Sequence, residues 1–184
     1  AYYADNLMRN AAFDTPSNRY GYALALTRTG ESGKAVEELR KLTAREPTSS
    51  VFELALADAL DQAGAKQASL QAYERLNSNF PGNRAITLAY AESLLKYKDD
   101  DSARHAQTLL RPLVERYPAD PDLQSTYGHS CELAGDKVRA AEAYAEAAFL
   151  NGHAEDALNQ LKSLSKQPGL TFYQRSRVDA RIAE

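Results

Sequence analysis

Residues 54–81, LALADALDQAGAKQASLQAYERLNSNFP, contain two helix-forming segments that are separated by a glycine and ended by a proline. Gly64 is suited to the left-handed backbone conformation that ends a helix. After it, Ser69, Tyr73 and Leu76 follow at steps of four and three residues, which places them on one helix face. The stretch therefore predicts a pair of helices that pack against each other through small and apolar side chains.

The same arrangement recurs along the chain at a nearly constant spacing. Pro47, Pro81 and Pro118 each follow such a helix, and the spacings between them are 34 and 37 residues. Thirty-four residues is the period of tetratricopeptide repeats, in which each unit is a helix pair. The longer spacing arises because residues 96–102, KYKDDDS, replace the glycine turn. We interpret this acidic stretch as a surface insertion, which solenoids tolerate well.

Alignment on the prolines reveals equivalent positions in the successive units. The first helix of each unit has a small residue where two helices must touch and an apolar residue three positions later, and the second helix has a triplet like that of residues 69–76. The small residues of the first helices are Ala23, Ala57, Ala91 and Gly128, and the apolar residues that follow them are Leu26, Leu60, Leu94 and Cys131. The further triplets of the second helices are Ala35–Leu39–Leu42, Ala106–Leu110–Leu113, Ala140–Tyr144–Ala147 and Ala157–Leu161–Leu164.

These patterns predict an all-α tetratricopeptide repeat solenoid of antiparallel helix pairs, curved into a right-handed superhelix. Residues 1–16 are expected to form a connector helix, residues 17–169 about four full units and an overlapping fifth, and residues 170–184 a capping helix. Ala140 and Ala157 lie only half a period apart, so we expect helix 137–150 to close the fourth unit and open the fifth. The eleven predicted helices span residues 2–12, 17–29, 32–45, 49–63, 66–79, 83–97, 102–116, 120–134, 137–150, 154–166 and 171–183.

The composition excludes several classes of protein. Hydrophobic residues make up 43% of the 184 residues, which is enough to bury a sizeable core and argues against wholesale disorder. The formal net charge of −3 lacks the basic surplus of a nucleic-acid binder. No apolar run is long enough for membrane insertion. The start, AYYADNLMRN, has no initiator Met and no signal-peptide pattern, so we expect a fragment or a processed chain.

The first helix of each tetratricopeptide pair lines the concave side of the array, which suits the capture of a peptide or a protein edge. The middle of this predicted groove is acidic with apolar spots, which favours basic or mixed apolar and basic segments. The alternative is that these side chains form ordinary solvated helix faces. The outward-turned positions are Tyr20, Leu24, Arg28, Leu54, Asp58, Asp61, Gln62, Leu88, Glu92, Leu95, Lys96, Ser125, His129 and Glu132. A clamp for C-terminal carboxylates needs several Lys and Asn side chains here, so we reject that class of partner.

No motif in the chain indicates catalysis. His105, His129 and His153 form no HExxH pair, and no nucleophile elbow, phosphate-binding loop or dinucleotide fingerprint occurs. Cys131, the single cysteine, occupies an apolar repeat position and is expected to be a buried structural thiol. The acidic run 99–101 lacks the spacing of a calcium loop and is expected to help start the next helix. We therefore expect no catalytic residue, no metal ligand and no cofactor in this chain.

Two stretches resemble a known family. Residues 19–42, RYGYALALTRTGESGKAVEELRKL, are similar to the first repeat after the peptidase domain in periplasmic zinc metallopeptidases of the β-barrel assembly-enhancing protease family. Residues 151–184, and above all QRSRVDARI at 174–182, are similar to the C-terminal end of that family. The half-period overlap near residue 150 also resembles it.

The resemblance implies a parent zinc metalloendopeptidase of the periplasm, whose repeat domain contacts outer-membrane barrel proteins or their assembly machinery during quality control. Zinc is then expected only in a separate peptidase domain, and residues 2–13 would connect the two domains. The alternatives are a stand-alone repeat adaptor or co-chaperone, for which the cytoplasm is the other possible location, and an enzyme with an unrecognised site. An HExxH motif upstream in the gene would favour the first hypothesis.

Overall fold

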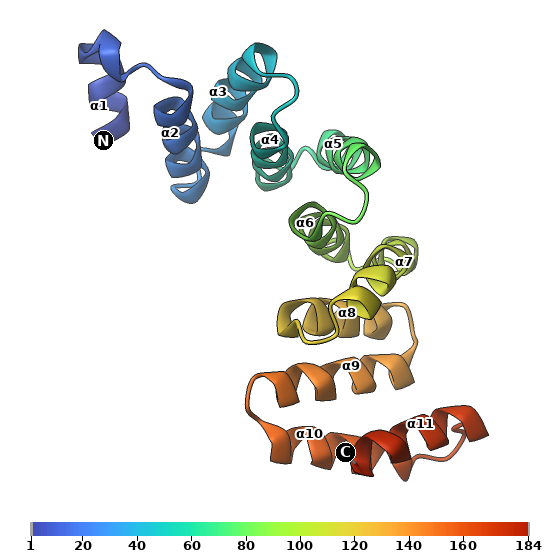
Figure 1. Cartoon of the computed structure of the whole chain (residues 1–184). Coiled ribbons are helices and arrows are strands. Elements are labelled where there is room, and N and C mark those ends of the chain that lie inside the picture. Colours follow the sequence, from blue (N-terminus) through green and yellow to red (C-terminus); the bar gives the residue numbers. More distant parts are fainter. Residues whose placement is uncertain (1, 184) are drawn as a thin grey trace. The chain divides into compact units, whose positions relative to one another are not determined.

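The structure is a computed structural model, and it describes residues 2–183. These residues form eleven α-helices and one 3₁₀ turn, with no β-strand among them (Figure 1). The predicted all-helical solenoid of helix pairs is confirmed, whereas its superhelical curvature stays a prediction. The elements are α1 Tyr2–Arg9, η1 Ala11–Phe13, α2 Pro16–Arg28, α3 Ser32–Arg45, α4 Ser50–Gln62, α5 Lys66–Asn79, α6 Arg84–Leu95, α7 Asp100–Arg116, α8 Pro121–Leu133, α9 Lys137–Leu150, α10 Ala154–Ser165 and α11 Phe172–Ala183.

The chain divides into two compact units, residues 1–86 and 87–184, and each is described by itself. In the first unit, α2 packs against α3, α3 against α4 and α4 against α5. Ala23 and Ala57 are fully buried at the predicted helix contacts. Ser69 is also fully buried, and its Oγ donates a hydrogen bond of 2.9 Å to the carbonyl oxygen of Ala57, which links α5 to α4.

The predicted first helix, residues 2–12, is shorter in the structure. Helix α1 ends at Arg9, and Asn10 adopts an extended conformation in which its side chain accepts a hydrogen bond from the amide of Ala12. Asparagine competes with the helical backbone in this way, so a separate 3₁₀ turn follows. Helix α1 still packs on α2. The ring of Tyr3 lies against Gly21 on α2, so closely that a β-carbon on Gly21 would be 2.8 Å from it.

In the second unit, α7 to α10 each pack against the next helix along the chain, so that α9 lies between α8 and α10 (Figure 1). The repeat triplets of α7 and α10 are buried, as predicted, while Tyr144 of α9 is only partly buried. Val178 of α11 joins the core cluster formed by Ala145, Ala157, Leu161 and Leu164. The last helix therefore extends the core of this unit.

The insertion at residues 96–102 replaces the glycine turn by another route. In the regular turns, Gly30 and Gly64 have φ values of +81° and +75°. Lys98 takes the left-handed conformation here, with φ of 53°. Asp99 then caps α7, because its Oδ1 accepts a hydrogen bond of 2.8 Å from the amide of Ser102. The acidic run starts the helix as expected, although α7 begins at Asp100, two residues earlier than predicted.

Candidate functional site

Two neighbouring first helices of the first unit, α2 and α4, present seven of the predicted groove residues. Tyr20, Leu24, Leu54, Asp58 and Asp61 are partly buried, and Arg28 and Gln62 are exposed. We call these seven residues the α2/α4 face.

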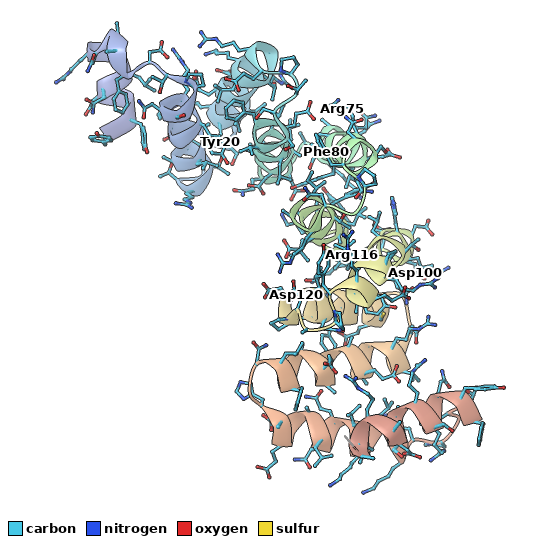
Figure 2. All side chains as sticks on the ribbon, in the orientation of Figure 1. Tyr20, Arg75, Phe80, Asp100, Arg116 and Asp120 are labelled. Atoms are coloured by element: carbon cyan, nitrogen blue, oxygen red, sulfur yellow. The ribbon has the colours of Figure 1, made fainter. Side chains whose placement is uncertain are left out.

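Two side-chain contacts order this face. The Tyr20 ring lies 5.4 Å from the ring of Phe52 on α4, measured between centroids, so it leans from α2 toward α4 (Figure 2). Nε2 of Gln62 donates a hydrogen bond of 3.0 Å to Oδ2 of Asp58. The result is a face in which leucine side chains lie beside carboxylates.

The remaining predicted residues lie on α6 and α8 in the second unit. On α6, Leu88 is partly buried and Glu92 is exposed, and Lys96, the first residue after this helix, is also exposed. Leu95 is only 4% exposed, so the prediction that it faces outward is wrong. Leu95 follows the fully buried Ala91 by four residues and therefore shares its buried face. On α8, Ser125, His129 and Glu132 are exposed, and Oε2 of Glu132 accepts a hydrogen bond of 2.8 Å from the Tyr144 hydroxyl.

The cysteine and the histidines are in separate environments. Cys131 is fully buried, and its Sγ accepts a hydrogen bond of 3.3 Å from Nε2 of Gln107. Burial raises the pKa of the Cys131 thiol, so it stays protonated and unreactive at neutral pH. The His105 ring packs edge-on against Tyr90, and His153 is the N-cap residue of α10. Within residues 2–183, no three His, Cys, Asp or Glu side chains come together in a way that could hold a metal ion.

The structure also reveals a cleft that the sequence analysis missed. It has a volume of about 1030 Å³ and is lined by residues of α7, α8, α9, α10 and α11, all in the second unit. The small side chains of Ala143, Ala145 and Ala157 and the larger Leu161 contribute apolar lining, and Phe149 lines it while remaining 59% exposed. We call this hollow the α9 cleft, because α9 contributes more of its lining than any other helix.

Two ion pairs join α11 to α9 beside this cleft. Nε and Nη2 of Arg177 each donate a hydrogen bond of 2.6 Å to Glu142, which raises the pKa of the guanidinium. One turn further along both helices, Arg181 pairs with Glu146. The arginine side chains are 51% and 43% exposed, whereas their glutamate partners are 18% and 17% exposed. The guanidinium groups therefore face the solvent and cover the carboxylates.

A sequence signal for this arrangement exists. Glu142 and Glu146 lie four residues apart, and so do Arg177 and Arg181, so each pair occupies one face of its helix. On α8, the cleft residues Gln124 and Tyr127 lie on a different side of the helix from Ser125, His129 and Glu132. The cleft is thus separate from the outward face that the repeat pattern predicts.

The helix pairs and their buried repeat positions define the class of this chain, which is a tetratricopeptide-type helical repeat array. No protein-family model matches it, and no curated protein sequence matches it. One similar solved structure is MamA from residue 41 to its end, from Desulfovibrio magneticus RS-1, with a TM-score of 0.66 and 17% identity over 92% of this chain and 90% of that chain. Another is a MamA RS-1 double mutant, with a TM-score of 0.68 and 16% identity over 92% of this chain and 93% of that chain. A thermophilic tetratricopeptide repeat protein of Thermus thermophilus is also similar, with a TM-score of 0.57 and 16% identity over 92% of this chain and 100% of that chain. At these identities the likeness is one of fold.

Proposed function

We propose that the chain is a protein-binding scaffold, and that it serves as the substrate- and partner-recognition domain of a periplasmic zinc metallopeptidase that acts in outer-membrane protein assembly and quality control. The observation that carries the proposal is the α2/α4 face, where Leu24 and Leu54 lie beside Asp58 and Asp61 on two neighbouring helices. The resemblance of residues 19–42 and 151–184 supports the link to the peptidase.

The chemistry of this face suits a segment with both apolar and basic side chains. Partly buried leucines offer apolar contact area, and nearby carboxylates attract Lys or Arg side chains. Segments of outer-membrane barrel proteins or of their assembly machinery are the proposed partners. Nucleic acid is not among the proposed partners. No helix within residues 2–183 is both long and apolar enough to cross a bilayer. In this proposal the zinc ion and the proteolytic chemistry belong to the peptidase domain of the parent protein.

The test uses an outer-membrane β-barrel protein that is unfolded in urea, diluted, and captured on a surface carrying the whole chain. Charge reversal by Asp58→Lys with Asp61→Lys should weaken binding by about tenfold, since it removes two attractive charges and adds two repulsive ones. The matched control is Glu37→Lys with Glu74→Lys, which reverses two exposed charges on the second helices α3 and α5. Thermal unfolding of both variants checks that the fold survives. Equal binding by the two double variants would contradict the proposal.

A stand-alone adaptor or co-chaperone is the second candidate function, with the cytoplasm as its alternative location. One observation favours it. The match to the Thermus thermophilus tetratricopeptide repeat protein covers 100% of that chain, so the solved chain consists of an array of this size and no further domain. The gene upstream of Ala1 distinguishes the two candidates, because an HExxH motif there supports the peptidase and its absence supports the adaptor. In either case we expect the chain alone to hydrolyse no unfolded protein substrate, with or without added zinc.

A further inference from the structure

The α9 cleft has the dimensions of a binding site. Its volume of about 1030 Å³ lies just above the usual range for ligand sites, which is about 300–1,000 Å³. Residues from five helices line it, so its shape depends on the packed core of the second unit and not on a loop. A site of this kind is largely formed before a ligand arrives, which reduces the entropy lost on binding.

The lining favours apolar side chains. Three alanines of α9 and α10 leave room between the helices, and Val114, Leu158 and Ile182 are partly buried around them. Phe149 is 59% exposed and lines the same cleft. Aromatic residues, phenylalanine among them, are enriched in the buried centres of protein interfaces.

The charges around the cleft favour an acidic ligand. Arg177 and Arg181 are far more exposed than Glu142 and Glu146, so an approaching segment meets guanidinium groups first. Arg177 uses Nε and Nη2 to bind Glu142, and its Nη1 remains to donate to a ligand. Because the ion pair holds the guanidinium in place, little side-chain entropy is lost when a ligand carboxylate binds to it.

Two further arginines line the same cleft. Arg139 is 46% exposed, against 30% for its partner Asp136, and Arg111 on α7 is 64% exposed. The lining carries four arginines against the three glutamates Glu115, Glu142 and Glu146. Glu142 and Glu146 are mostly covered, whereas Glu115, which pairs with Arg111, is 72% exposed. The positive charge of the rim therefore comes mainly from Arg139, Arg177 and Arg181, above an apolar floor.

We propose that the α9 cleft binds a segment of a partner protein in which apolar side chains alternate with aspartate or glutamate. The apolar side chains enter the hollow beside Phe149, and the carboxylates bind the exposed guanidinium groups of Arg111, Arg139, Arg177 and Arg181. This preference is opposite to that of the α2/α4 face, which favours basic segments. The chain therefore has two protein-binding surfaces with different charge requirements.

The test measures the fluorescence anisotropy of a labelled synthetic peptide of about ten residues, in which Leu and Phe alternate with Glu and Asp. One control peptide has Lys in place of every acidic residue, and another has Ser in place of every apolar residue. We expect only the acidic and apolar peptide to bind the whole chain, and we expect its affinity to fall as salt is raised from about 0.05 M to about 0.5 M. Equal binding of the Lys peptide, or no binding of any peptide, would overturn the proposal.

Two matched pairs of variants locate the peptide. Phe149→Ala should weaken binding by at least about fivefold, whereas Phe172→Ala, at an aromatic residue that is 79% exposed outside the cleft, should leave it unchanged. Arg111→Glu should weaken binding and reduce its salt dependence. Arg104→Glu on the same helix, where Arg104 likewise forms an exposed ion pair across four residues, should change neither.

Other occupants give different results. If the cleft instead binds a second copy of this chain, sedimentation will show dimers that Phe149→Ala disrupts, and the peptide will not bind to the dimer. That result, or an equal loss of peptide binding in Phe149→Ala and Phe172→Ala, rejects the proposed ligand. The α2/α4 face is untouched by these variants, so its own test is independent of this one.

Discussion

The ring of Tyr144 on α9 lies directly against the backbone of Gly128 on α8, so closely that a β-carbon on Gly128 would come within 2.8 Å of the ring. The Tyr144 hydroxyl also donates to Glu132, which holds the ring in this position. The contact explains why the fourth unit has glycine at a position where the other units have alanine.

Gly128→Ala should therefore destabilise the chain by about 1–3 kcal/mol, because the added methyl group overpacks the contact. Urea unfolding measures the change. Gly33→Ala is the matched control, since Gly33 also lies in a helix but a β-carbon there would meet nothing within 4 Å, and it should stabilise the chain by about 0.5–1 kcal/mol. Combining Gly128→Ala with Tyr144→Leu should recover part of the loss. Equal effects of the two alanine substitutions would contradict the packing described here.

The stability of the first unit should depend on pH through the carboxyl group of Glu38. This carboxyl group lies between two cations, because Nη1 of Arg19 donates to it at 2.8 Å and Nζ of Lys41 at 2.6 Å. Burial raises its pKa, but the hydrogen bonds from Lys41 and Arg19 outweigh burial and hold the pKa below the ordinary value of 4.5. The stabilisation is therefore complete above the ordinary pKa and is lost as the pH falls through the lowered one.

Glu38→Gln should accordingly lower the free energy of unfolding by about 1 kcal/mol at neutral pH and should have less effect in acid, where the wild-type carboxyl is protonated. Chemical unfolding at several pH values between neutral and strongly acidic measures this difference. Glu37→Gln, at the exposed neighbouring position, is the control and should change stability little. A Glu38→Gln effect that is the same at every pH would show that the charge is not responsible.

Attachment of α11 should depend on Val178. Its side chain is fully buried among Ala145, Ala157, Leu161 and Leu164, and it is the buried residue of α11. Val178→Ala removes about two methylene equivalents from this cluster and should cost about 1–2 kcal/mol. Hydrogen exchange should become faster in α11 and remain unchanged in α3 to α5. Val51→Ala, at a valine that is 53% exposed on α4, is the control. Equal exchange in both variants would place α11 outside the core.

Helix positions were predictable from the sequence because they follow from local patterns. The triplets of the second helices, the small and apolar positions of the first helices and the glycine turns locate α2 to α10 to within a few residues. The end of α1 was not predictable in this way, since it depends on the side chain of Asn10 competing with the backbone. The repeat alignment places Leu95 on the outward face, although its spacing of four residues from Ala91 indicates the burial that the structure shows.

The α9 cleft was beyond a repeat-based analysis for a different reason. Arg177 and Arg181 lie 35 residues from their partners Glu142 and Glu146 in the chain, and each pair forms only because α11 packs beside α9. A repeat alignment treats the last helix as a cap and does not define which face it covers. The matching spacing of Glu142 and Glu146 with Arg177 and Arg181 becomes meaningful once that packing is known.

Cys131 should be closed to thiol reagents in the folded chain. It is fully buried on α8 and accepts a hydrogen bond from Gln107, so a reagent cannot reach its sulfur atom. Burial also raises its pKa, which disfavours the reactive thiolate form. At mildly alkaline pH, a disulfide reagent should label Cys131 in the folded chain more than about a hundredfold more slowly than in the chain unfolded by concentrated guanidinium. The folded chain reacts slowly because opening a buried helix costs several kcal/mol.

Ser125→Cys, which places a second thiol at an exposed position of the same helix, should add one equivalent that reacts at once. Gly128→Ala should accelerate labelling of Cys131, because it loosens the contact that holds α8 against α9. Rapid labelling of Cys131 in the unaltered chain would instead show that α8 opens readily. In that event, the pairing of α8 with α9 would not support a rigid cleft beside it.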